Sequence, residues 1–212
     1  MKLPFTQAQF LEVFAAYNEA VWPLQILLNA VAVAMVIVAI RSPERAGRLV
    51  CIGRALLWSW LAVGYHLPFF WPINPAAPFF AGISLAAAGS FLWLGVFRPS
   101  LQFHAGMDAR KNIGLVVIVF ALAGYPLIGK ATGLSYPAIP TFGLPCPTTL
   151  FTFGILLVAA RPLPRWLLVA PMAWAAIGAG AAFSLGITQD LALLVMLVLG
   201  AYMLAFNRRS AK

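Results

Sequence analysis

The chain has 212 residues, of which 63% are hydrophobic and only 9% are charged, and its formal net charge is +9. Soluble domains carry about 25% charged residues, so a soluble fold of this length could not cover so much apolar surface, and the excess must face lipid. The positive charge does not indicate nucleic-acid binding, because the sequence shows no basic groove interleaved with aromatic residues.

A short helix is predicted at the start of the chain. Thr6 and Gln9 have the spacing of a capping box, and Leu11, Phe14 and Tyr17 share one helical face. The same stretch contains acidic and polar residues, so it lacks the unbroken apolar core of a cleavable signal peptide. We therefore expect a mature N-terminus whose helix lies on the outer interface of a membrane.

Seven apolar runs follow this helix. A helix needs about 20 residues to cross about 30 Å of hydrocarbon, and the runs do not alternate as the strands of a membrane barrel would. The predicted fold is all-α, a single polytopic transmembrane helix bundle of about seven spans over residues 1–212. The runs are 21–40, 55–70, 79–97, 113–129, 148–160, 166–185 and 191–206.

The loops between the runs predict an orientation. With seven spans, 12 of the 14 Lys and Arg residues fall on one side, and only Lys2 and Lys130 fall on the other. The positive-inside rule then places the C-terminus in the cytoplasm and the N-terminus outside. The cations on the inner side are Arg41, Arg45, Arg48, Arg54, Arg98, Arg110, Lys111, Arg161, Arg165, Arg208, Arg209 and Lys212.

Polar residues gather in the outer half of the first span and just before it. Asn18, Gln25 and Asn29 are spaced seven and four residues apart, which places them on one helical face. Because unpaired amides in lipid are costly, this face should point into the bundle, where it either bonds neighbouring helices or lines a cavity. Glu19 lies near the interface and is either a solvated or capping carboxylate or an acid of a binding site.

The second and third spans carry two further patterns. His66 and Ser59 share a face of the second span, with His66 at its outer end, and the imidazole is either a hydrogen-bonded structural group or a ligand or proton carrier. In the third span Gly82, Ala86 and Gly89 form a stripe of small residues, which predicts close packing against another helix.

A proline-rich loop precedes the fifth span. Its sequence, SYPAIPTFGLPCPTTLF, cannot form a regular helix throughout, because proline lacks an N–H, and it is too apolar to be disordered. The run that follows is too short to cross a membrane by itself. We therefore expect the loop to pack on, or dip into, the outer mouth of the bundle, with Gly143–Pro147 ordered and buried.

Cys146, Thr148, Thr149 and Thr152 stand at the predicted start of the fifth helix. Free N–H groups at a helix start favour anions and can lower the pKa of a thiol, so this is an anion pocket, a reactive cysteine, or a capped helix whose cysteine only fills space. The other cysteine, Cys51, falls on the opposite side of the membrane, which excludes a disulfide between the two.

Three stretches carry a resemblance to a known family. YNEAVWPLQ, GYHLPFFWPINPAA and YPAIPTFGLPCPTTLFTFG, in this order, resemble a family of bacterial multi-pass membrane proteins of unassigned function. The resemblance implies a bacterial inner-membrane location. It supplies no substrate, cofactor or catalytic residue.

Two functional hypotheses follow. The first is a small-solute or ion transporter or binding protein whose outward-facing pocket is lined by Glu19, Gln25, Asn29, His66, Cys146, Thr148 and Thr149. The alternative is a non-catalytic sensor or accessory subunit of a larger membrane complex. The expected partners are the lipid bilayer, a small-molecule ligand, and a membrane-protein partner or a second copy of the chain, with no nucleic acid.

An enzyme is the least favoured hypothesis. His66 and His104 fall on opposite sides of the membrane, so they cannot hold one haem. His66, Cys146, Glu19 and Asp190 are all predicted outside, but they lack any metal-ligand spacing motif. No cofactor and no metal site is therefore predicted.

Overall fold

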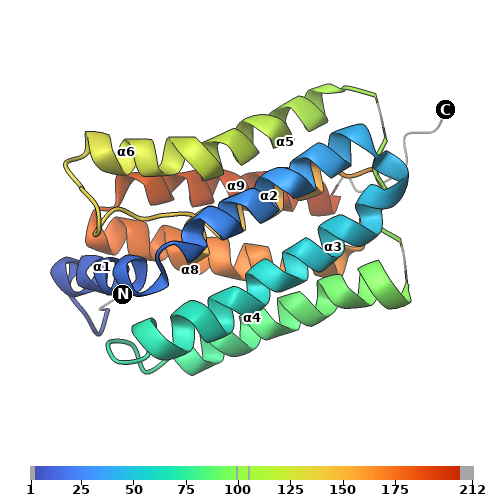
Figure 1. The fold of residues 1–212 in the computed structure, drawn as a ribbon. Helices are drawn as coiled ribbons and strands as arrows, with labels where there is room; N and C mark the ends of the chain where they lie inside the picture. Colours follow the sequence, from blue (N-terminus) through green and yellow to red (C-terminus); the bar gives the residue numbers. More distant parts are fainter. Residues whose placement is uncertain (1–2, 99, 105, 206–212) are drawn as a thin grey trace.

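A computed structural model describes residues 3–98, 100–104 and 106–205 of the chain, and the regular elements within these residues are all helices (Figure 1). Lys2, Arg208, Arg209 and Lys212 of the predicted charge pattern lie outside the described residues. The first half contains α1 (Gln7–Val21), α2 (Leu24–Arg41), α3 (Pro43–Trp60) with the π-helical η1 (Leu61–Phe70), and α4 (Ala77–Leu92) with η2 (Trp93–Phe97). The second half contains α5 (Ala109–Val119), η3 (Phe120–Gly124), α6 (Tyr125–Ala131), α7 (Pro145–Val158), η4 (Arg165–Leu168), α8 (Val169–Leu185), η5 (Thr188–Asp190) and α9 (Leu191–Ala205).

The predicted all-α helix bundle is confirmed. Six helices of the described chain are long and apolar enough to cross a membrane. The fifth predicted span is the shorter helix α7. The six long helices are Leu24–Arg41, Pro43–Phe70, Ala77–Phe97, Ala109–Ala131, Arg165–Leu185 and Thr188–Ala205.

Helix α7 is the centre of the bundle. Each of its 14 residues is buried, and it packs against α3, α5, α8 and α9. At 1.5 Å per residue it reaches only about 21 Å, which is short for a helix in contact with lipid. The surrounding helices bury all of its residues, so its length does not need to match the thickness of a bilayer.

Two glycines allow α5 and α7 to approach closely. A Cβ atom on Gly114 would lie 2.7 Å from the Gly154 carbonyl oxygen, and one on Gly154 would lie 2.9 Å from the Gly114 carbonyl oxygen. The stripe in α4 behaves differently, because a Cβ on Gly82 or Gly89 would meet no atom within 4 Å. The prediction that this stripe packs closely was therefore wrong within the described chain, and the close contact is made instead by a pair in other helices.

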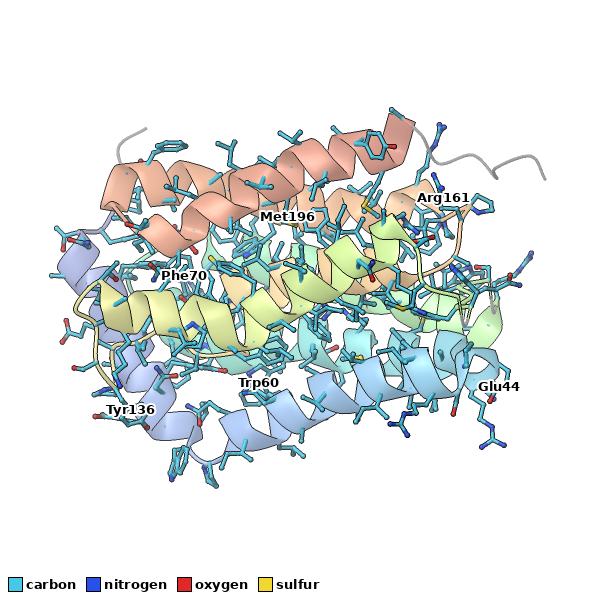
Figure 2. The ribbon with its side chains drawn as sticks, turned by 90° about the horizontal axis from the view of Figure 1, so that it is seen from above. Glu44, Trp60, Phe70, Tyr136, Arg161 and Met196 are labelled. Carbon is cyan, nitrogen blue, oxygen red and sulfur yellow. The ribbon has the colours of Figure 1, made fainter. Side chains whose placement is uncertain are left out.

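The two ends of the bundle differ in charge, because cations in or next to the loops, such as Arg41, Arg98 and Arg161, lie at the same end. The α2–α3 turn, the described residues between η2 and α5, and the 159–164 connection lie at one end, here called the basic end (Figure 1). Helix α1 and the connections 71–76 and 132–144 lie at the other, here called the α1 end. Figure 2 shows Glu44 and Arg161 at the basic end and Tyr136 at the α1 end.

Arg54 does not belong to the basic end, although the sequence pattern grouped it with the loop cations. It lies within α3 with no exposed surface and donates hydrogen bonds from Nη2 to the Thr148 carbonyl and the Thr152 hydroxyl. Its guanidinium carbon lies 5.2 Å from the ring centroid of Phe151. The prediction failed because the apolar run begins at residue 55, whereas the helix begins at Pro43.

Helix α1 forms as predicted. The Thr6 hydroxyl accepts from the Gln9 N–H and the Gln9 side chain accepts from the Thr6 N–H, which is the expected capping box. The helix crosses the end of the bundle instead of following its axis (Figure 2). Its buried face, which includes Phe10, Phe14 and Tyr17, packs on η1.

Candidate functional site

Asn18 attaches the proline-rich loop to the end of α1. Its side-chain amide donates to the carbonyl oxygens of Pro137 at 2.6 Å and Ile139 at 2.8 Å. Its side-chain oxygen accepts from the Thr141 hydroxyl at 2.6 Å, and its backbone carbonyl accepts from the Tyr136 hydroxyl at 3.2 Å. One fully buried side chain therefore satisfies polar groups on three loop residues that have no regular secondary structure.

The end of this loop is buried, as predicted for Gly143–Pro147. Gly143 has φ +102°, and a Cβ there would lie 2.6 Å from Leu28 Cδ1 and 2.9 Å from the Tyr17 hydroxyl oxygen, so only glycine fits. The same Tyr17 hydroxyl accepts a hydrogen bond from Trp60 Nε1 at 2.8 Å. Burial raises the pKa of Tyr17, which keeps the phenol neutral.

A cavity of about 700 Å³ lies at the α1 end. It is bounded by α1, η1, α4, α8 and the start of α7. Most of its surface is apolar, and aromatic side chains from five different helices contribute to it. These side chains include Phe10 and Phe14, Tyr65 and Phe70, Phe79 and Phe80, and Trp174.

Three polar side chains meet in one wall of this cavity. The Tyr125 hydroxyl donates to a carboxylate oxygen of Asp190, and the Cys146 thiol interacts with both groups. Asp190 is only 1% exposed, and in the described part of the chain no basic side chain pairs with it. A carboxylate buried without a cation is costly, so this wall is suited to a ligand that brings hydrogen-bond donors or a positive charge.

The structure places the predicted site residues in different surroundings. Of the seven, Cys146 lines the cavity. Gln25 is buried beside Asn18, whose backbone carbonyl accepts from the Gln25 amide at 2.9 Å, and Asn29 in turn donates to the Gln25 carbonyl at 2.9 Å. The side-chain amides of Gln25 and Asn29 thus donate to backbone carbonyl oxygens of the protein, and neither residue lines the cavity. Glu19 is exposed.

His66 is enclosed by aromatic rings. Its centroid lies 4.9 Å from that of Trp174, 5.3 Å from Tyr65 and 6.1 Å from Phe80. The side chain has no exposed surface, and neither ring nitrogen has a hydrogen-bond partner within the described residues. His66 therefore lies behind the aromatic wall of the cavity. Trp174 contacts His66 and also lines the cavity.

The threonines at the start of α7 face the interior of the bundle. Thr148 and Thr149 have no exposed surface, and within the described chain their hydroxyl oxygens have no partner. The Thr148 carbonyl accepts from the Thr152 hydroxyl at 2.7 Å and from Arg54. In the part of the chain that the structure covers, no three His, Cys, Asp or Glu side chains are grouped so that they could hold a metal ion.

Sequence reasoning did not select Tyr125 or Trp174 for the site, and it considered Asp190 only as a metal ligand. Asp190 offered a usable signal, since an acidic residue next to an apolar run of membrane length is a functional hypothesis by default. Tyr125 and Trp174 offered none, because aromatic residues in apolar runs are ordinary core and interface residues.

The comparisons with known proteins give a family but no activity. A family model described as "Family of unknown function (DUF6064)" matches residues 7–212. No curated protein and no solved structure matches the chain.

Proposed function

The chain belongs to this family of unknown function, and we propose that it is an integral membrane protein that binds a mostly apolar small molecule in the cavity at the α1 end. The single observation that carries the proposal is the cavity itself. Its volume of about 700 Å³ falls in the range of small-molecule sites, about 300–1,000 Å³. Such sites are lined mainly by apolar and aromatic side chains with a few convergent polar groups, which is the composition found here.

The polar wall defines the ligand chemistry. Asp190 accepts from Tyr125 and has no cationic partner in the described chain, so its remaining lone pairs suit a donor on the ligand. An amine or hydroxyl on an aliphatic or aromatic body satisfies this requirement. A free carboxylate on the ligand would be repelled by Asp190.

The surroundings of the cavity support entry of a ligand from the lipid or from the outer surface of the membrane. Phe79 of α4 and Gly180 of α8 are exposed and line the cavity, so its opening is continuous with the outer surface of the bundle. Because the loop cations gather at the basic end, the positive-inside rule supports a cell-membrane protein whose α1 end faces outward. The cavity then faces outward, as expected for a carrier or a solute-binding transporter.

Filling the cavity is the direct test. Gly180 lines it, and a Cβ there would meet no atom within 4 Å, so Gly180→Phe adds bulk at the cavity from an open position. Gly82→Phe is the matched control, because Gly82 is equally open and does not line the cavity. Two dansyl probes with the same alkyl chain, one an amine and one a carboxylate, would be titrated into purified protein.

We expect the amine probe to bind at least tenfold more tightly than the carboxylate probe, Gly180→Phe to abolish binding, and Gly82→Phe to leave it unchanged. Asp190→Asn should remove the preference for the amine. Binding that Gly180→Phe leaves intact would overturn the assignment of the cavity. If neither probe binds and a membrane protein co-purifies in equal amount, the alternative of an accessory subunit replaces the binding hypothesis.

A further inference from the structure

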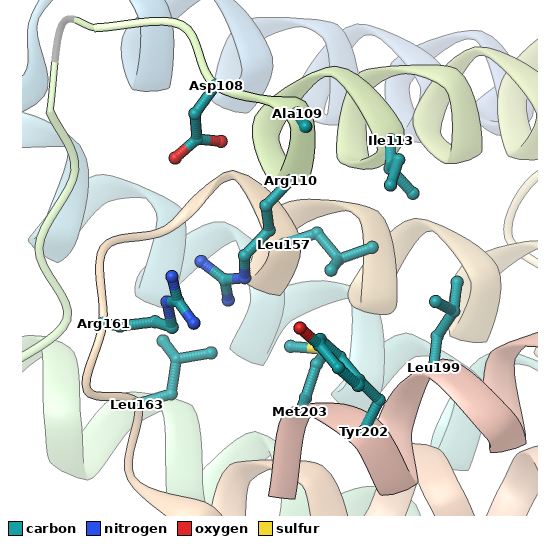
Figure 3. A pocket seen from close by; sticks show the side chains of 10 residues that line it. All are labelled: Asp108, Ala109, Arg110, Ile113, Leu157, Arg161, Leu163, Leu199, Tyr202 and Met203. Atoms are coloured by element: carbon teal, nitrogen blue, oxygen red, sulfur yellow. The ribbon is translucent and has the colours of Figure 1, made fainter. Parts of the chain in front are cut away.

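A second, separate pocket lies at the basic end. It has a volume of about 350 Å³ and is formed by the start of α5, the connection after α7 and the last turns of α9 (Figure 3). Figure 3 shows the guanidinium groups of Arg110 and Arg161 next to each other at one side of this pocket. The two positive charges are close enough to repel each other.

The position of Arg110 is fixed by the chain. It donates to the carbonyl oxygens of Ala159 and Leu156 (the latter at 2.7 Å), which are left without helical partners at the end of α7. A guanidinium carries five N–H donors, so Arg110 keeps donors for a further acceptor after these two bonds. The repulsion between the two arginines and the spare donors of Arg110 both favour an anion between them.

One carboxylate, that of Asp108, also lines the pocket, and its contacts with other groups reduce its repulsion of a bound anion. An oxygen of Asp108 accepts from the Lys111 backbone N–H at 2.7 Å and thereby caps α5, and the other lies 3.9 Å from His104 Nε2. Among the described residues that line the pocket are two guanidinium groups and this single carboxylate.

The other side of the pocket is apolar and reaches the outer surface of the bundle. Leu157 and Met203 are buried there, whereas Ile113 of α5 and Tyr202 of α9 are 45% and 54% exposed. A ligand held here would have a charged group against the arginines and an apolar part along α5 and α9. This is the chemical division of a phospholipid, at the depth of its headgroup.

We propose that this pocket binds a phosphate ester between Arg110 and Arg161, supplied by the headgroup of an anionic phospholipid of the leaflet at the basic end. Arginine holds phosphate through several N–H donors at once, and basic pockets between membrane helices on the cytoplasmic side bind anionic headgroups. The site is independent of the cavity at the α1 end and requires no property of that cavity.

The test compares two sources of phosphate on delipidated full-length protein in a neutral detergent. Short-chain phosphatidylglycerol, short-chain phosphatidylcholine and inorganic phosphate would each be titrated, with the thermal unfolding midpoint and lipid retained in native mass spectra as readouts. We expect phosphatidylglycerol to raise the midpoint and to remain bound, and the other two to have little effect. Equal stabilisation by phosphatidylglycerol and phosphatidylcholine would overturn the proposal.

Variants locate the effect. Arg161→Gln should lower the apparent affinity for phosphatidylglycerol about tenfold, the loss expected for one charged hydrogen-bonding contact. Arg45→Gln, which changes an exposed arginine at the same end, should leave the affinity unchanged. Ile113→Trp keeps both guanidinium groups and fills the apolar side, so it should weaken phosphatidylglycerol binding even if Arg161→Gln does not fold. If inorganic phosphate stabilises the protein as well as phosphatidylglycerol does, and Ile113→Trp does not change this effect, the phosphate does not come from a lipid headgroup and the proposal is wrong.

Discussion

The side-chain nitrogen of Asn18 lies 2.6 Å from the carbonyl oxygen of Pro137, although 119 residues separate the two in sequence. This contact and its neighbours connect the end of α1 to the proline-rich loop, whose continuation supplies Cys146 to the cavity wall. The loop is thus a fixed part of the α1 end, and the position of the cavity wall depends on a residue outside the cavity.

Asn18→Ala should destabilise the protein and release the loop. The change leaves the Pro137 and Ile139 carbonyls and the Thr141 hydroxyl without their buried partner, at a cost of about 1–3 kcal/mol. The thermal unfolding midpoint should fall, and chymotrypsin should cut after Phe142, which is buried in the wild type.

Asn29→Ala is the matched control for this prediction. Among the residues that the structure describes, the Asn29 amide donates only to the Gln25 carbonyl one turn earlier in the same helix, so its loss should have little effect on the unfolding midpoint and expose no cleavage site. If the two variants behave alike, Asn18 does not hold the loop.

Arg54 should tolerate removal of its charge better than replacement by lysine. Its guanidinium has no exposed surface, and Nε and Nη1 have no partner within the described chain. In Arg54→Met the Thr152 hydroxyl still donates to the Thr148 carbonyl, so that carbonyl keeps a donor and the hydroxyl keeps one hydrogen bond, and an apolar side chain suits the site. Lysine keeps a buried charge but loses the planar contact with Phe91 and Phe151.

The measurement for Arg54 is the unfolding midpoint of both variants. We expect Arg54→Met to stay close to the wild type and Arg54→Lys to lose about 1–3 kcal/mol of stability. The reverse order would show that the positive charge itself is required at this position.

The sequence predicted the fold because hydropathy is a long-range average over many residues. Each of the seven apolar runs corresponds to a helix, and the short fifth run is α7. Arg54 shows the limit of this reasoning, since a charge beside an apolar run has the same sequence pattern whether it lies at the end of a helix or buried about three turns inside one.

The candidate site was less predictable from the sequence. The proline composition correctly predicted a buried loop end at Gly143–Pro147, because prolines and apolar side chains together exclude both helix and disorder. The meeting of Tyr125, Cys146 and Asp190 depends on how three helices pack, and helical periodicity within one helix carries no information about its neighbours.

The contact between α5 and α7 predicts that Gly154 cannot be enlarged. In Gly154→Ala the new Cβ would lie 2.6 Å from Ile118 Cγ1 and 2.9 Å from the Gly114 carbonyl oxygen, so the two backbones must move apart, at about 1–3 kcal/mol. Gly89→Ala places the same methyl group in open space on α4 and should leave the unfolding midpoint unchanged or slightly raised. Equal midpoints for the two variants would contradict the central packing of α7.

The last prediction concerns orientation across the membrane. If the positive-inside rule applies, the α1 end is outside and the basic end is cytoplasmic. Ser135→Cys and Glu44→Cys place exposed thiols at these two ends, and the native Cys51 and Cys146 are buried. In intact cells a membrane-impermeant maleimide should label Ser135→Cys and should reach Glu44→Cys only after permeabilisation. A reporter fused after Asn74 should be active outside and one fused after Lys212, beyond the described residues, should be active in the cytoplasm. Labelling of Glu44→Cys in intact cells would reverse the orientation, and the large cavity would then face the cytoplasm.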